Sequence, residues 1–156
     1  MLARMSTPVR SQPATSATAA DVRTAIAAIV AAALVLVGSL GTWATISVSI
    51  TPGAPTAAGV SKGGLDGDGG ITLVLAFVAA AMAVLWATRP ARWQDAVAAL
   101  AAGLTVVIGI VDVLDVRDAG GGAVEASVGW GLWLVLLGGI ALAITAVLRF
   151  VRNRTA

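Results

Sequence analysis

The chain has 156 residues, of which 58% are hydrophobic and only 12% charged, and its formal net charge is +2. A soluble domain needs more polar side chains to cover its surface, so this composition indicates a membrane protein. The lack of Cys and His excludes disulfides, zinc sites built from thiolates or imidazoles, thiol nucleophiles and Ser-His catalytic pairs.

A polar N-terminal region precedes the first apolar segment. Residues 1–23 are rich in Ser, Thr, Pro and Ala without apolar periodicity, which predicts a disordered cytoplasmic tail. Asp21 is expected to cap the following helix. The uncharged run after Arg23 predicts a first membrane span over residues 24–43, ending at Trp43. A secretory signal peptide is the alternative, but the lack of a clean A-x-A cleavage site favours an uncleaved anchor.

Hydroxyl-bearing and branched apolar residues alternate directly after this span. The alternation covers residues 45–50 and has a period of two, which is typical of a short, half-buried strand. Pro52 ends the pattern. The small polar residues and glycines that follow predict a flexible loop up to residue 70.

Three further apolar segments complete the predicted fold. They are residues 71–88, residues 93–114 and residues 127–148. A tight basic turn with Pro90 separates the second and third spans, and Asp95 follows it where the helix dipole favours a negative charge. Residues 151–156 are expected to form a basic cytoplasmic tail. The sequence therefore predicts an all-α membrane protein: a four-transmembrane-helix bundle over residues 24–150 with a small extracytoplasmic loop cap and a short β-strand.

The positions of the basic residues predict the orientation of the chain. Eight of the ten Lys and Arg residues fall on one side of this topology: Arg4, Arg10, Arg23, Arg89, Arg92, Arg149, Arg152 and Arg154. Lys62 and Arg117 fall on the other side. By the positive-inside rule, both termini and the turn near Pro90 are cytoplasmic. Because these charges lie beside apolar segments and not along one helix face, we expect a lipid bilayer as a partner and no nucleic acid.

Carboxylates in and near the loops give two candidate sites. Asp66 and Asp68 stand two residues apart on a glycine-rich turn, which resembles the start of a calcium loop without its later ligands. They are weak metal candidates, and a turn in which Asp68 caps the second helix explains the same residues. Asp112, at the outer end of the third span, is either part of an ion path or a solvated interfacial carboxylate.

The tryptophans and the small residues have expected packing roles. Trp43, Trp130 and Trp133 are expected to anchor the bundle at the outer membrane interface, and Trp86 and Trp93 at the inner one. Helix packing in lipid depends on close approach, so small residues spaced four apart are candidate contacts. These are Ala27 and Ala31, Ala79, Ala83 and Ala87, Ala98 and Ala102, and Gly139 and Ala143.

Three short motifs resemble those of a known family. They are Trp43 after the first span, Gly64-Leu-Asp-Gly-Asp-Gly69 before the second, and Ser127-Val-Gly-Trp-Gly-Leu-Trp-Leu134 at the start of the fourth. Over residues 24–150 the chain resembles the small four-span integral membrane proteins of actinobacteria. This resemblance implies the same topology in a bacterial plasma membrane and no particular activity.

These observations favour a non-enzymatic accessory protein without a cofactor. Its extracytoplasmic loops would contact another membrane or envelope protein, or a second copy of the chain. The alternative is a small transporter or channel component in which Asp112 lies near the membrane path. An enzyme acting on lipid is least favoured, because Asp66, Asp68 and Asp112 have no evident nucleophile or cofactor motif beside them.

Overall fold

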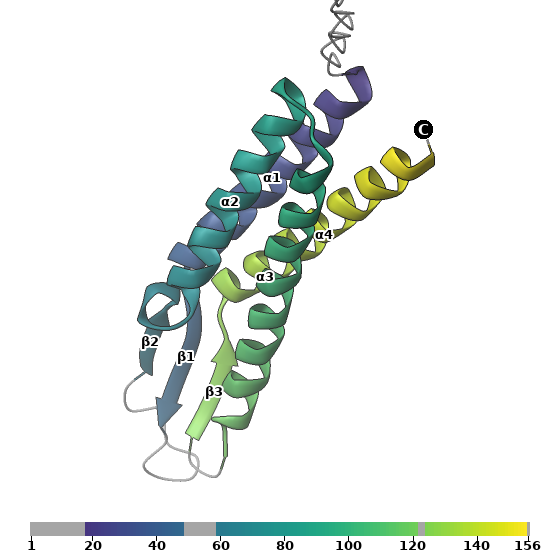
Figure 1. Ribbon diagram of the computed structural model, residues 1–156. Helices are drawn as coiled ribbons and strands as arrows, with labels where there is room; N and C mark the ends of the chain where they lie inside the picture. Colours follow the sequence, from purple (N-terminus) through teal and green to yellow (C-terminus); the bar gives the residue numbers. More distant parts are fainter. Residues whose placement is uncertain (1–17, 49–58, 122–123, 156) are drawn as a thin grey trace, which may run out of the picture.

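Four long helices and a small antiparallel sheet make up the described part of the chain, residues 18–48, 59–121 and 124–155 of a computed structural model (Figure 1). The helices are α1 (Ala19–Leu40), α2 (Gly69–Thr88), α3 (Arg92–Asp118) and α4 (Trp130–Thr155). The strands are β1 (Thr42–Val48), β2 (Gly59–Gly63) and β3 (Val124–Val128), and a short 3₁₀ helix, η1 (Gly64–Asp66), leads from β2 to α2. The predicted class, a four-helix bundle with a short strand in its cap, is confirmed.

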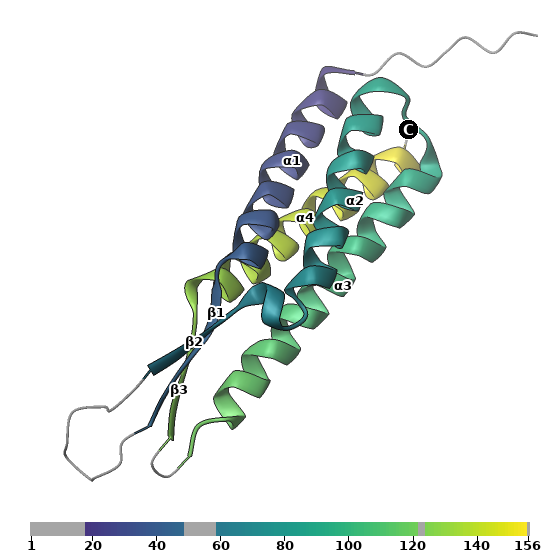
Figure 2. The ribbon, with the colours of Figure 1, turned by 90° about the vertical axis from the view of Figure 1, so that its left-hand side faces the viewer.

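Each helix packs against two others around the bundle, α1 against α2 and α4, and α3 against α2 and α4. Successive helices run in opposite directions, so α1 and α3 begin where α2 and α4 end (Figures 1 and 2). We call this the basic end because it carries Arg23, Arg89, Arg92, Arg149, Arg152 and Arg154. We call the opposite end, from which the three strands extend, the sheet end.

All four helices are long and apolar enough to cross a membrane, so the chain is a multi-pass integral membrane protein. The longest, α3, has 27 residues. At about 1.5 Å per residue it is about 40 Å long, which exceeds the roughly 30 Å hydrocarbon core of a bilayer. Its last turns therefore continue past the other helices and lie beside β3 at the sheet end (Figure 2).

The bounds of α1 differ from the predicted span at both ends. The helix begins before residue 24 because Thr18 and Asp21 form a capping box. The Asp21 amide donates to Thr18 Oγ1 at 3.3 Å, and the Thr18 amide donates to Asp21 Oδ2 at 3.0 Å. The predicted tail over residues 1–23 is therefore helical from Ala19 onward, and its first part, residues 1–17, lies outside the described residues. At the other end, α1 stops before Trp43, which belongs to β1.

The last helix, α4, begins and ends later than the predicted residues 127–148. Its start is delayed because residues 124–128 pair with β1 as a strand. Its end lies within the predicted basic tail, of which residues 151–155 are helical. Arg152 and Arg154 lie in the last turn, where positive charge is favourable to the helix dipole.

The sheet has the antiparallel strand order β2-β1-β3. The predicted strand is confirmed as far as Val48, and residues 49–58 lie outside the described residues. The loop prediction is wrong for Gly59–Gly63, which forms β2 and pairs with β1 from Ser47 to Thr42. Sequence reasoning missed β2 because a five-residue segment with two glycines has little strand propensity of its own.

The two faces of the sheet have different chemistry. Ala44 and Ile46 of β1, with Ala126 of β3, face the last turns of α3 and line a cavity there. The alternate residues form the opposite face. This second surface, which we call the hydroxyl face, consists of Thr45, Ser47, Ser61, Glu125 and Ser127.

The interior of the bundle is filled mainly by alanine. The buried alanines on the helices are Ala25, Ala28, Ala31, Ala32, Ala76, Ala79, Ala83, Ala98, Ala101, Ala102 and Ala146. Of the predicted contacts, the pairs Ala79 with Ala83 and Ala98 with Ala102 are buried in full, and Gly139 is buried, whereas Ala27 is exposed. Small side chains allow the close backbone approach that stabilises helix pairs in lipid.

Glycines bring α1 and α4 together most closely. A Cβ atom on Gly38 would lie 2.5 Å from the carbonyl oxygen of Gly131, and one on Gly138 would lie 2.8 Å from that of Ala31. These neighbours are backbone atoms, which cannot rotate away. Nearby, a buried hydrogen bond of 2.7 Å between the hydroxyls of Ser39 and Thr72 joins α1 to α2.

Gly138→Ala is expected to destabilise the bundle by about 1–3 kcal/mol, because the added methyl group meets the backbone of α1. Gly103→Ala is the matched control, since this glycine is also helical and nothing lies within 4 Å of its Cβ position. Thermal unfolding in detergent, followed by Trp fluorescence, measures both changes. Equal melting temperatures for Gly138→Ala and the unsubstituted protein would contradict this packing.

Candidate functional site

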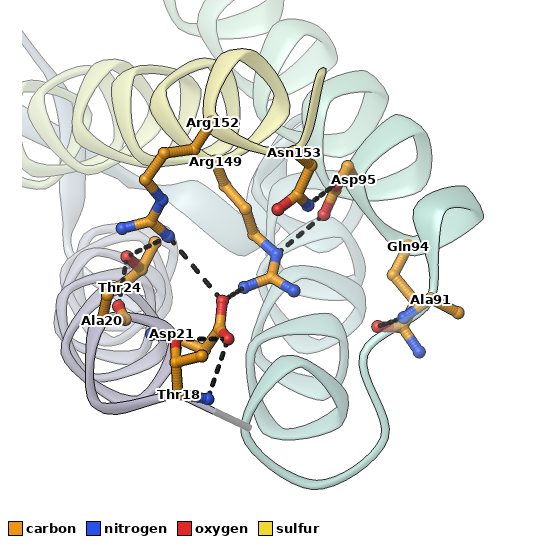
Figure 3. A network of polar contacts seen from close by, with 10 residues as sticks. All are labelled: Thr18, Ala20, Asp21, Thr24, Ala91, Gln94, Asp95, Arg149, Arg152 and Asn153. Carbon is orange, nitrogen blue, oxygen red and sulfur yellow. Dashed lines mark hydrogen bonds and ion pairs between the residues drawn. The ribbon is translucent and has the colours of Figure 1, made fainter. Parts of the chain in front are cut away.

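Arg149 lies buried at the basic end and contacts one residue from each of the other helices. Its side chain is 2% exposed. Nη1 pairs with the carboxylate of Asp21 on α1, and Nε donates to Oδ1 of Asp95 on α3 at 2.9 Å (Figure 3). Its guanidinium carbon lies 4.9 Å from the ring centre of Trp86 on α2. One side chain of α4 therefore joins all four helices.

Further polar groups complete this arrangement, as Figure 3 shows. Asn153 Nδ2 donates to the second carboxylate oxygen of Asp95 at 2.7 Å. Arg152 lies 3.8 Å from the Asp21 carboxylate and donates to Thr24 Oγ1 at 3.2 Å. We call Asp21, Trp86, Asp95, Arg149, Arg152 and Asn153 the arginine cluster. Its two positive and two negative charges balance, and a buried ion pair requires such compensation because desolvation of an unpaired charge is costly.

The turn between α2 and α3 holds Asp95 in position. The buried Gln94 side chain donates to the Arg89 carbonyl at 2.9 Å. It also accepts a hydrogen bond from the Ala91 amide at 3.2 Å (Figure 3). These two bonds fix the first turn of α3. As a result, the adjacent carboxylate of Asp95 points toward α4.

Sequence reasoning placed the members of the arginine cluster separately and missed their association. Asp21 takes part in capping α1, but as the third helical residue of a capping box whose N-cap is Thr18, and Asp95 lies in the first turn of α3 as predicted. In the sequence, Arg149 is one of three arginines that follow the last predicted span. The available signal was the topology itself, which brings the starts of α1 and α3 to the same end as the last turns of α4.

A second polar site lies at the sheet end, in a cavity of about 210 Å³ between the sheet and the last turns of α3. Its charged lining residues are Lys62 of β2 and Asp112 and Asp115 of α3, and Trp43 forms part of the apolar lining. Oδ2 of Asp112 is buried and has no hydrogen-bond partner among the described residues. The predicted candidate Asp112 thus lies in a cavity, with a lysine on the opposite wall.

The other carboxylate candidates, Asp66 and Asp68, have turn-forming roles. Asp66 Oδ2 accepts a hydrogen bond from the Gly63 amide at 3.0 Å. Asp68 occupies the N-cap position of α2 as predicted, but it caps through its backbone carbonyl, which accepts from the Ile71 amide at 2.9 Å, and not through its side chain. Within the described residues, no group of three or more acidic, His or Cys side chains is placed to hold a metal ion.

Two of the five predicted interfacial tryptophans lie inside the protein. Trp43 is buried where α1 meets the sheet, and its Nε1 donates to the Gly38 carbonyl at 2.9 Å. Trp86 is buried against Arg149. These two side chains pack against protein and not against lipid, which corrects their predicted role. The side chains of Trp93, Trp130 and Trp133 are exposed, and their anchoring role stays a prediction.

The chain matches no protein-family model and no curated protein sequence.

Arg149→Ala is expected to destabilise the protein by about 3–5 kcal/mol, because it leaves the buried Asp95 carboxylate without its charge partner. Arg23→Ala, which removes an exposed arginine at the same end, is the control. The triple change Arg149→Met, Asp95→Asn and Asp21→Asn removes the buried guanidinium and both carboxylates that pair with it, leaves only the half-exposed Arg152 charged, and should restore much of the loss. Melting curves in detergent compare these variants. If Arg149→Ala melted like Arg23→Ala, the arginine cluster would contribute nothing to stability.

Proposed function

We propose that this integral membrane protein is a non-enzymatic accessory protein whose sheet contacts another membrane or envelope protein. It lies in a bacterial plasma membrane with both termini in the cytoplasm, so that the sheet end faces outward. The arginines of the basic end support this orientation, because positively charged residues flank membrane spans preferentially on the cytoplasmic side.

The hydroxyl face is the observation that carries the proposal. Its Ser61, Glu125 and Ser127 side chains are exposed, whereas the opposite face of the sheet is directed toward α3. The hydroxyls of this face, together with the Glu125 carboxylate, offer hydrogen-bond donors and acceptors of the kind that line the polar rim of a protein interface.

The β2 edge extends the same surface. Among the described residues β2 pairs on one side only, with β1, and it is exposed from Gly59 to Lys62. The unpaired N–H and C=O groups of an edge strand are a template for adding a strand from another protein. The Lys62 side chain lines the sheet-end cavity. Its charge therefore shares this cavity with those of Asp112 and Asp115.

A transporter or channel component is the second candidate, which the unpartnered Asp112 in the sheet-end cavity favours. Between this cavity and the arginine cluster, the described interior is packed mainly with Ala, Gly and Val, and its buried polar side chains are Ser39, Thr72 and Thr105. An ion path through one copy would have to cross this apolar packing. The second candidate therefore requires an oligomer with the path between copies.

Single-cysteine labelling tests the orientation, because the chain has no cysteine of its own. Ser61→Cys and Ser127→Cys should react with a membrane-impermeant maleimide on intact cells. Thr88→Cys, exposed at the basic end, should react only after the membrane is permeabilised. The reverse pattern would refute the proposed orientation, and equal labelling of all three sites on intact cells would refute the separation of the two ends by a membrane.

Photo-cross-linking tests the contact surface. A photoreactive maleimide on Ser61→Cys should capture a second, different protein in living cells, which mass spectrometry of the cross-linked peptide identifies. Thr88→Cys, at the opposite end, is the matched control and should not capture that protein. Ser127→Arg, which places a large charge on the hydroxyl face, should abolish the cross-link without changing the melting temperature. Capture of the same chain alone would favour the transporter candidate, and no capture at all would contradict both.

A further inference from the structure

A second cavity lies at the basic end, between the first turn of α3 and the last turns of α4. Its volume is about 360 Å³, within the range of about 300–1,000 Å³ that is typical of small-ligand sites. Its lining residues are Arg92, Asp95, Phe150, Asn153 and Arg154. Neither the sheet nor the sheet-end cavity is near it, so the proposed partner contact does not use it.

The cavity is electrically positive despite the presence of Asp95. Both oxygens of that carboxylate are already paired, one with Arg149 and the other with Asn153, so its charge is neutralised within the arginine cluster. Arg92 and Arg154 are exposed and add two positive charges at the mouth of the cavity. The first turn of α3 contributes the positive end of one helix dipole and the last turn of α4 the negative end of another, so the two arginines decide the sign of the charge at the cavity.

The guanidinium of Arg154 is held beside the cavity. It lies 4.2 Å from the ring centre of Phe150, which is a cation–π contact. Such stacking uses the face of the guanidinium and leaves its N–H donors at the edge available for an anion. Arg92 approaches from the other helix. An anion in the cavity would therefore be bound from two sides.

The depth of the cavity matches the headgroup region of a bilayer. Leu148 is the last residue of the uncharged run of α4, and Phe150 and Arg154 lie within the next two turns of the helix. On α3, the exposed Trp93 adjoins Arg92, and exposed tryptophans with neighbouring arginines are typical of the membrane–water interface. Basic cavities between helices at this level bind the phosphate groups of anionic lipids.

We propose that this cavity binds the phosphate of an anionic phospholipid headgroup, with Arg92 and Arg154 as its charged ligands and Asn153 beside them. The acyl chains would extend along the apolar surfaces of α3 and α4 into the bilayer. A free phosphate ion has the same charged group, so the test separates the two sources.

The test titrates the full-length protein, in a neutral detergent, with phosphatidylglycerol, phosphatidylcholine or inorganic phosphate, and follows Trp fluorescence, to which Trp93 next to the cavity contributes. Phosphatidylglycerol should bind more tightly than the other two. Arg92→Gln and Arg154→Gln should each weaken its binding by about fivefold, the effect typical of one basic side chain at an anionic lipid surface. Arg89→Gln is the matched control, an exposed arginine at the same end that does not line the cavity.

Melting temperatures without lipid should be equal for all these variants, because the substituted arginines are exposed. The proposal would be overturned if Arg89→Gln weakened phosphatidylglycerol binding as much as the two cavity variants do, or if the cavity variants did not weaken it. Only a non-specific attraction between the basic end and anionic lipid would then remain. Binding of phosphatidylcholine as tight as that of phosphatidylglycerol would also overturn it. Binding of inorganic phosphate as tight as that of phosphatidylglycerol would replace the lipid by a free phosphate.

Discussion

The burial of Arg149 is the constraint on which the arrangement of the helices depends. A guanidinium with 2% of its side chain exposed persists only if carboxylates compensate it. Asp21 and Asp95 supply this compensation from α1 and α3, and Trp86 of α2 packs against the same group. These contacts therefore fix the positions of the four helices relative to one another along the bundle axis. α1 must start early enough to include Asp21, and α4 must continue beyond its uncharged run, which ends at Leu148.

Between the arginine cluster and the buried Ser39–Thr72 hydrogen bond near the sheet end, the described helices have no comparable directional contact. Because lipid tails are as apolar as the helix surfaces, the middle of the bundle depends on close packing at Gly138 and on the alanines of each helix. At the sheet end, Trp43 makes the directional contacts. Its indole binds the Gly38 carbonyl, and its own carbonyl accepts from the Gly129 amide at 2.7 Å. The sheet is thus joined to the end of α1 and the start of α4, which gives the hydroxyl face a fixed place outside the bundle.

The membrane spans could be predicted because each has a local signal in the sequence, an uncharged run of the length that a bilayer requires. The strand β1 could be predicted for the same reason, from its period of two. The start of α4 could not, because residues 124–128 become a strand only by pairing with β1, about eighty residues earlier. The arginine cluster could not be predicted because a charged residue at the end of a span can be either buried in the protein or exposed to water. Trp86 has the same ambiguity, since a Trp near a helix end suits either lipid or a buried cation.

The central claim is that one buried arginine holds the basic ends of the helices together, and spin-label distances test it most directly. Labels on Arg23→Cys and Trp93→Cys, both exposed, report the separation of α1 and α3 at the basic end, and labels on Leu40→Cys and Leu114→Cys report the sheet end. The account predicts a narrow distance distribution for both pairs, and a broad, longer one for the basic-end pair alone when Arg149→Met is added. An unchanged distribution at the basic end after Arg149→Met would contradict the account.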